Sequence, residues 1–295
     1  MRVLTQNVLM GGEDRFDALC DVLRAARPDL LVLQECLGWQ DGVRLRTLAR
    51  CCDIPEDDRH LFLSQSNPRG SGKRYHVALL SRAAILTVRA HTDGFAHSVL
   101  DATVAVPTSA SPGPGPTLRI LGAHLVSSHE DARLAETDVL LSLVLASLAR
   151  GEDLIVAGDL NSLSPRDPYP VDLGERFVQL GITKYGNPPR FDVLRRLFSV
   201  GLLDSFDRRK PDAPWASAVR GRRDGGPDQG LRVLTRTDSV LLSARLAQRL
   251  VDGGIVDVGQ ASDHHAVYAD LNDSHHFSEN EDVNQTSDAR SGQSS

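Results

Sequence analysis

The chain has 295 residues, 41% of them hydrophobic, and a formal net charge of −6 from 33 basic and 39 acidic residues. This length and apolar content are enough for one large hydrophobic core. The stretch 272–295 holds five acids and one base, so the rest of the chain is near −2. That balance excludes a generic polyanion binder, because nonspecific nucleic-acid affinity needs many lysine and arginine contacts to phosphates. The overall charge does not exclude a local basic patch.

The cysteines and the apolar runs indicate the compartment. The four cysteines show no zinc-type spacing, and we expect small, buried, reduced thiols, as in a reducing compartment. A strand-like run starts directly at residue 2 without a signal-peptide pattern, and no charge-free stretch reaches transmembrane length. We therefore expect a soluble, cytoplasmic protein that has no membrane partner and no obligate protein partner.

Apolar periodicity and breaker residues predict alternating strands and helices. In chain order we expect a strand at 2–8, a helix at 14–26, a strand at 30–35, a short helix at 43–51, antiparallel strands with tight connections at 75–81, 85–90 and 99–106, a strand at 118–125, a helix capped by Ser128 and ending near 150, a buried strand from 154, a helix at 191–199, and strands at 237–243, 255–258 and 265–271.

The segments between these elements are read from composition. The Pro-, Gly- and Ser-rich segment 107–116 is predicted to be an exposed loop within a hairpin, and 162–189 to be mostly loop with one helical turn near Phe177. The segment 207–236 has eight bases against four acids and is predicted to be irregular. We expect one catalytic body over 1–271 and a disordered, polar, acidic tail over 272–295.

One buried strand ends in an acid and an amide. The apolar run from Leu154 leads to Asp159 and Asn161, which lie two residues apart and should point into one space, with Gly158 giving the backbone room to turn. The Asp can take a cation or a proton, and the Asn amide can donate to an oxyanion. Taken alone, a Gly-Asp pair after a strand is more often just a turn.

Polar residues recur at the ends of the other predicted strands, and such side chains converge on one crevice in a layered fold. They are Asn7, Glu35, His124, Asp238, Asp263 and His264. Carboxylate and amide oxygens such as those of Glu35, Asp263 and Asn7 suit magnesium, whereas no His or Cys group has zinc spacing. A histidine held by a carboxylate can abstract a proton, and His264 with Asp238 fits that relation.

With these motifs together, the sequence resembles the endonuclease/exonuclease/phosphatase superfamily, which includes DNase I-like and exonuclease III-like enzymes. The matching pieces are Thr5-Gln6-Asn7-Val8, Leu33-Gln34-Glu35, Gly122-Ala123-His124-Leu125, Gly158-Asp159-Leu160-Asn161, Arg236-Thr237-Asp238 and Ser262-Asp263-His264, in the family's order. The resemblance implies an α/β fold, a four-layer αββα sandwich of two mixed sheets with outer helices. It also implies phosphoester hydrolysis with Mg²⁺ or Mn²⁺.

The resemblance also implies a role for each matching residue. Glu35 would be the main metal ligand with Asn7 and Asp263 nearby, Asp159 and Asn161 would orient the attacking water and the phosphate, His264 would be the base, Asp238 its orienter, and His124 the phosphate-side histidine. Tyr75 or His76 is a further candidate for a phosphate contact.

The substrate stays open between two classes. A phosphorylated small molecule is at least as well supported as DNA or RNA, because the body of the chain is near neutral and few aromatic residues alternate with its basic ones. The basic segment 207–236 is the only candidate for a nucleic-acid groove, and its interpretation as a solvated loop is slightly favoured. An alternative of another kind is a binding module, or a non-hydrolytic small-molecule enzyme, on the same fold. Intact metal-ligand positions favour the hydrolase over that alternative.

Overall fold

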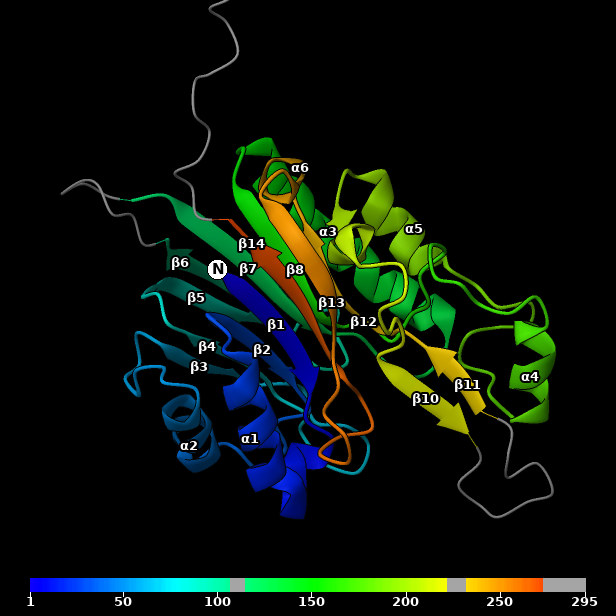
Figure 1. The fold of residues 1–295 in the computed structure, drawn as a ribbon, viewed down its shortest axis with the longest axis horizontal. Helices are drawn as coiled ribbons and strands as arrows, with labels where there is room; N and C mark the ends of the chain where they lie inside the picture. The colour runs from blue at the N-terminus through cyan, green and yellow to red at the C-terminus, as the bar shows by residue number, and fades with distance from the viewer. Residues whose placement is uncertain (107–114, 222–231, 273–295) are drawn as a thin grey trace, which may run out of the picture.

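Two mixed six-stranded sheets form the centre of the molecule. The computed structural model describes residues 1–106, 115–221 and 232–272 (Figure 1). The first sheet has the order β13 (Leu250–Val256), β14 (Ala266–Leu271), β1 (Arg2–Asn7), β2 (Leu30–Gln34), β4 (Val77–Ser81) and β3 (Leu61–Ser64). The second has the order β5 (Ile85–His91), β6 (Val99–Ala105), β7 (Thr117–His124), β8 (Asp153–Asp159), β12 (Asp238–Leu242) and β9 (Leu203–Asp204).

Helices cover the outer faces of both sheets. The first sheet is covered by α1 (Phe16–Ala26) and α2 (Val43–Cys51), and the second by α3 (Glu130–Ala149) and α5 (Asp192–Ser199) (Figure 1). The short helix η1 (Met10–Arg15) directly precedes α1. The remaining short helices are α4 (Leu173–Gln179), η2 (Ser205–Arg208) and α6 (Ala244–Ala247). The predicted four-layer αββα sandwich is confirmed.

The layering explains why the central strands are apolar along their whole length. In β2, Leu31 and Leu33 pack in the cluster beneath α1 and α2, whereas Leu30 and Val32 pack in the cluster between the sheets. Because alternate side chains point to opposite faces, a strand buried on both faces is apolar at every position. A third cluster lies between the second sheet and α3 with α5.

The strand directions bring the polar strand ends together. β1 pairs with β2 in parallel, and β7 pairs with β8 in parallel. β12 is antiparallel to β8, and β14 is antiparallel to β1. The carboxyl ends of the four parallel strands and the start of β12 and β14 therefore meet at one edge of the sandwich.

Several elements differ from the sequence-based expectation. β3 and β9 are additional strands, and 207–236 contains a two-stranded hairpin, β10 (Ala218–Gly221) with β11 (Arg232–Thr235). β4 belongs to the first sheet, whereas β5 and β6 belong to the second, so the three are not one meander. The N-cap of α3 is His129, whose ring accepts from Ala132 N, and not Ser128.

The strand expected at 255–258 is instead β13, which begins at Leu250 and ends at Val256. Other expectations are met or lie outside the described residues. α2 has the predicted bounds, and the four cysteines are free. Within the described residues no helix is long and apolar enough to span a membrane. Residues 107–114 of the loop predicted at 107–116, and residues 273–295 of the tail predicted at 272–295, lie outside the described residues. β6 and β7 are antiparallel neighbours, as expected for a hairpin.

Candidate active site

Three adjacent strands of the second sheet place three of the candidate residues side by side. In the register of this sheet, Asp159 at the end of β8 lies opposite both His124 at the end of β7 and Asp238 at the start of β12. Gly158 permits the close approach of β7 and β8, since a Cβ on it would lie 1.8 Å from Ala123 O. Gly158 therefore acts within the strand, and the chain turns only after Asp159.

Asp159 and Asn161 are both buried and are joined through the turn that follows β8. The Asn161 backbone N donates to Asp159 Oδ1 over 2.8 Å, and Asn161 has a left-handed φ of 50°. The Asn161 Nδ2 donates to Leu125 O over 2.9 Å. Because Nδ2 carries two hydrogens, one N–H of Asn161 is still available to an oxyanion. The Asn161 backbone thus lies against the Asp159 carboxylate, and the shared role of the two side chains stays a prediction.

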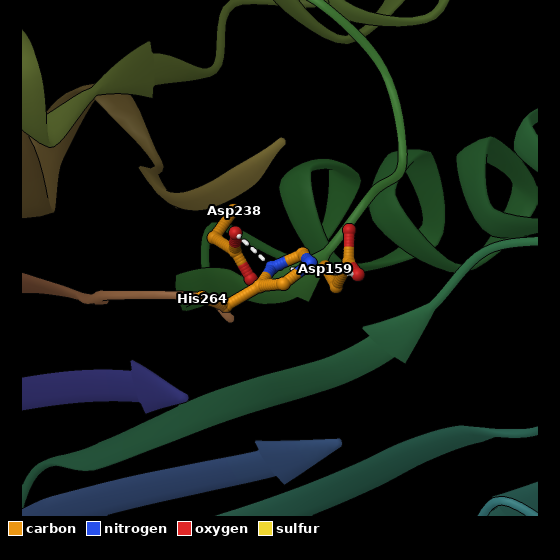
Figure 2. A group of neighbouring side chains, drawn as sticks. All are labelled: Asp159, Asp238 and His264. Atoms are coloured by element: carbon orange, nitrogen blue, oxygen red, sulfur yellow. Dashed lines mark hydrogen bonds and ion pairs between the residues drawn. The ribbon is translucent and has the colours of Figure 1, made fainter. Parts of the chain in front are cut away.

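The histidine and its carboxylate partner form a buried dyad (Figure 2). His264 Nδ1 lies 2.8 Å from Asp238 Oδ2, and these residues are 5% and 0% exposed. The same Asp238 oxygen accepts from Ser217 Oγ over 2.6 Å. Ser217 Oγ also accepts from the backbone N of Thr237, so it ties the start of β12 to the segment before β10.

His264 is held in place through the backbone on both sides. Its carbonyl accepts from Gln6 Nε2 over 2.9 Å, and its amide N donates to Ser262 Oγ over 3.2 Å. An isolated bridge between His264 and Ala218 connects the histidine to the base of the β10–β11 hairpin. These contacts fix the ring relative to Asp238, as a positioned proton acceptor requires.

His124 belongs to a stack of rings beside Asp159. Its Nε2 lies 3.9 Å from Asp159 Oδ2, and its ring is parallel to that of His97 at a centroid distance of 4.2 Å. Tyr75 packs edge-on against His97. His76 is fully buried, and its Nδ1 accepts from the backbone N of Ser66. Tyr75 is therefore two rings from the site, and its suggested phosphate contact stays a prediction, as does that of His76.

Asn7 connects two carboxylates. Its Nδ2 donates to Glu35 Oε1 over 3.2 Å and to Asp159 Oδ2 over 3.1 Å, while its Oδ1 accepts from Leu9 N. The second oxygen of Glu35 accepts from Met10 N. Glu35 follows β2 with a left-handed φ of 59°, which turns its side chain toward Asn7. The structure thus brings Asn7 and Glu35 together as predicted.

These donors fit a hard divalent cation. Two carboxylates share the Asn7 amide, and a cation there would offset their mutual repulsion. Carboxylate oxygens are the ligands that Mg²⁺ and Mn²⁺ prefer. Asp263 is half-buried between Ser262 and His264, next to this edge. As oriented, Asn7 presents its N–H groups to Glu35, so direct ligation by Asn7 stays a prediction, as does ligation by Asp263.

A second group of potential ligands consists of Asp159, Asp238 and His264, whose donor atoms all lie within 4.8 Å of one another. Asp238 Oδ2 already accepts from His264 and Ser217, which favours an orienting role over metal ligation. Asp238 Oδ1 and His124 Nδ1 are buried without a hydrogen-bond partner among the described residues. Unsatisfied buried polar atoms at a polar site are points at which water, substrate or an ion can bind.

The charges around Asp159 keep it ionised. Burial opposes ionisation, but His264, His124 and Lys184 outweigh it and lower the pKa of Asp159 to about 2. Burial, together with His124 and Arg69, lowers the pKa of His97 to about 2. Asp159 is thus an anion and His97 a neutral ring at neutral pH.

The sequence did not single out three residues that the structure places at the site. Ser217 holds Asp238, His97 stacks on His124, and Lys184 Nζ donates to Asn161 Oδ1 over 3.0 Å. Ser217 and Lys184 come from segments without periodicity, where no pattern indicates a partner. His97 lies just before the strand predicted from residue 99, and this position next to a strand end is the sequence feature that could have indicated it as a site residue.

The basic segment 207–236 is only partly free for a ligand. Arg236 is 1% exposed and bonds both Asp167 and Asp204, so it is part of the core. Burial opposes the charge of Arg236, but the two carboxylates raise its pKa above the ordinary value. Asp207 pairs with Arg166. The tip of the hairpin, 222–231, lies outside the described residues.

Comparison with known proteins gives a family and a fold. The model of the Endonuclease/Exonuclease/phosphatase family matches residues 4–264. No curated protein matches the sequence. The AP endonuclease of Archaeoglobus fulgidus is similar in structure, with a TM-score of 0.64 and 16% identity over 92% of this chain and 99% of that one.

Two further solved structures are similar. A substituted form of the 3′ phosphatase NExo from Neisseria, bound to product DNA hairpin, has a TM-score of 0.63 and 20% identity over 92% of this chain and 99% of that one. Truncated TDP2 of Caenorhabditis elegans has a TM-score of 0.59 and 17% identity over 91% of this chain and 96% of that one. At these identities the structures show the shared fold.

Proposed function

Because the chain belongs to the Endonuclease/Exonuclease/phosphatase family, we propose that it is a divalent-metal-dependent hydrolase of phosphoester bonds. The observation that carries this proposal is the His264–Asp238 dyad, whose donor atoms lie within 4.8 Å of an Asp159 oxygen, at the same edge of the sandwich as Glu35. A proton acceptor, an ionised orienting acid and a hard metal-ligand set in one place are what in-line attack of water on phosphorus requires.

The chain's residues divide the reaction between them. Asp238 holds the proton on His264 Nδ1, so Nε2 is the atom that takes a proton from water as the water oxygen attacks phosphorus and the bond to the leaving oxygen breaks. Asp159 accepts a hydrogen bond from that water and orients it. The free N–H of Asn161 and the ring of His124 donate to the phosphoryl oxygens as negative charge develops.

Glu35, together with Asp263 and Asn7, would hold Mg²⁺ or Mn²⁺. When bound, the cation supplies positive charge to the phosphoryl group and the leaving oxygen. The pairing of Glu35 and Asp159 through Asn7 supports this placement, since a metal held by Glu35 would be close to the acid that orients the water.

The test is hydrolysis of a substrate panel with Mg²⁺ by wild type, His264→Ala and Glu35→Gln. The panel holds plasmid DNA, abasic duplex, single-stranded RNA, inositol phosphates and an aryl phosphodiester. We expect at least one substrate to be cleaved, and each variant to lose roughly 10²–10⁴-fold in kcat. Near-full activity of His264→Ala on the cleaved substrate would contradict the assignment of the base.

Nucleic acid is the second candidate for the substrate class. It is supported by the names of the structural relatives, an AP endonuclease and a 3′ phosphatase bound to a DNA hairpin. The charge of Arg69, which contributes to the low pKa of His97, also places positive charge near the site. Cleavage of the DNA or RNA substrates, with inositol phosphates untouched, would decide for this class.

A binding module or non-hydrolytic enzyme is the remaining alternative. A metal titration separates it from the hydrolase. Binding of Mg²⁺ or Mn²⁺ by wild type, with loss of that binding in Glu35→Gln, supports the hydrolase, and its absence in both supports the module.

Two organisational proposals accompany this function. We propose that 1–271 is one catalytic unit, supported by a site that draws on both Asn7 and His264. The free cysteines are consistent with a reducing, cytoplasmic compartment.

A further inference from the structure

Lys184 places a positive charge directly on the Asp159–Asn161 pair. It lies in the connection between α4 and α5, and its Nζ donates to Asn161 Oδ1 over 3.0 Å. It also contributes to the low pKa of Asp159. An ammonium carries three hydrogens, and Asn161 takes one of them, so Lys184 keeps donors for a further acceptor at this point.

A buried network holds the backbone of Lys184 in place. Arg133 on α3 is fully buried, and its guanidinium donates to Lys184 O and, over 3.0 Å, to Ser162 Oγ. Glu130 accepts from the same guanidinium over 2.8 Å. The segment after Asn161 and the Lys184 loop are thus fixed by one arginine.

The aromatic side chain next to Lys184 restricts the lysine further. Tyr185 is fully buried and stacks on Phe177 of α4 at a centroid distance of 5.1 Å. The Lys184 Nζ lies 4.9 Å from the centre of the Tyr185 ring, within cation–π range. A half-buried lysine held by its carbonyl and its neighbouring ring loses less entropy on ligand binding than a free surface lysine.

The orientation of Asn161 also depends on Lys184. An ammonium can only donate, and Leu125 O can only accept, so Oδ1 faces Lys184 and Nδ2 faces Leu125. The free N–H of Asn161 and the remaining donors of Lys184 are therefore anchored to the same side chain. Two donors held this close suit adjacent oxygens of one phosphoryl group.

We propose that Lys184 binds a non-bridging oxygen of the substrate's phosphoryl group and that its charge favours a dianionic, terminal phosphate over a monoanionic diester. The inference rests on the proposed function for the identity of the ligand. The attraction of a fixed cation grows with the charge on the phosphate, so a dianion gains more from Lys184 than a monoanion does.

The test measures binding of two probes by calorimetry with Mg²⁺ present. The probes are inorganic phosphate at a mildly alkaline pH, where it is a dianion, and dimethyl phosphate, a monoanion. The variants are Lys184→Met and Lys184→Arg, with Lys210→Met as the matched control, because Lys210 is exposed and its loss removes the same charge from the chain. Thermal unfolding checks that each variant is folded.

We expect Lys184→Met to weaken phosphate binding roughly 10-fold or more, the loss of one charge-assisted hydrogen bond, and to weaken dimethyl phosphate binding less. Lys184→Arg should stay within about threefold of wild type, and Lys210→Met should not differ from it. Equal phosphate affinity in Lys184→Met and wild type overturns the contact, and so does an absence of phosphate binding by wild type. An equal loss for both probes overturns the preference for a dianion.

Hydrolysis separates this inference from the proposed function. His264→Ala should bind phosphate like wild type while losing hydrolysis of the substrate panel. If wild type hydrolyses nothing on the panel, the proposed function fails, and the phosphate measurements still decide the role of Lys184. If Lys184→Met lowers kcat with phosphate affinity unchanged, Lys184 only positions Asn161, and the contact is overturned.

Discussion

Replacing Asp238 by Asn tests the dyad most directly, because the change removes one charge while keeping the size of the side chain. His264 Nδ1 lies 2.8 Å from Asp238 Oδ2, and neither residue is more than 5% exposed. Loss of a charge-assisted bond to a buried group costs about 1.5–3 kcal/mol. If the Asn N–H₂ faces the ring, Nδ1 must become the acceptor, and Nε2 then carries the proton and cannot accept one from water.

We expect these two effects together to lower kcat of Asp238→Asn by roughly 10³–10⁴-fold, or about 4–5.5 kcal/mol. Ser217→Ala provides a graded comparison, because it keeps the carboxylate and removes one donor 2.6 Å away, for an expected loss of roughly 10-fold. The assay is steady-state hydrolysis across pH with the substrate found for wild type, and thermal unfolding of both variants. A folded Asp238→Asn that stays within threefold of wild type, with an unchanged pH profile, would refute the role of the dyad.

Three further outcomes concern stability, measured by chemical denaturation. Gly158→Ala should lower the free energy of unfolding by about 3 kcal/mol or more, because its Cβ would lie 1.8 Å from Ala123 O. An unchanged stability would show that β7 and β8 can separate at this point. The fold lowers the pKa of His97 from 6.5 to about 2, so only the unfolded chain takes up this proton as the pH falls. The free energy of unfolding should therefore drop by about 2 kcal/mol between pH 7 and pH 5. The variant His97→Phe should lack this contribution to the pH dependence of stability. Arg236→Met leaves the buried carboxylates of Asp167 and Asp204 without their cation and should lower the free energy of unfolding by about 3–5 kcal/mol. A loss below about 1 kcal/mol would show that water reaches these carboxylates.

Long apolar runs and strand ends carried most of the predictable information. The run before Asp159 is apolar at successive positions because β8 is covered on both faces, and that pattern is readable without a structure. The polar residues that end such runs converge because parallel strands share an edge. The placement of Asp159 beside His124 and Asp238 follows from this regularity.

Features that depend on long-range pairing were not readable from the sequence. The β10–β11 hairpin lies in a segment whose arginines and glycines suggest irregular structure, and a four-residue strand has too few positions to show alternation. β4 and β5 are near neighbours in sequence but belong to different sheets, which local periodicity does not encode. The same holds for Lys184, whose partner Asn161 is 23 residues away in an aperiodic loop.

The buried leucines of α3 show a further limit. The spacing of Leu134, Leu141, Leu145 and Leu148 predicts the apolar face, but the fully buried positions include Leu140 and Val144, and Leu145 is 50% exposed. Arg133 and Thr137 are buried on this helix as well, since Arg133 has Glu130 and Ser162 as partners and the Thr137 hydroxyl donates to Arg133 O. When charged residues form hydrogen bonds inside the core, the buried face of a helix no longer coincides with its row of apolar residues.

The position of β14 between β1 and β13 has a consequence for folding. His264 lies two residues before the start of β14, and Gln6 donates to the histidine carbonyl across 258 residues of sequence. A nascent chain emerging from the ribosome contains Asn7, Glu35 and Asp159 long before it contains the residue that completes the dyad. Contacts of such large sequence separation form late and slowly. The onset of catalysis during refolding should therefore coincide with the docking of β14, so that enzyme activity reports the last step of assembly and not the collapse of the two sheets.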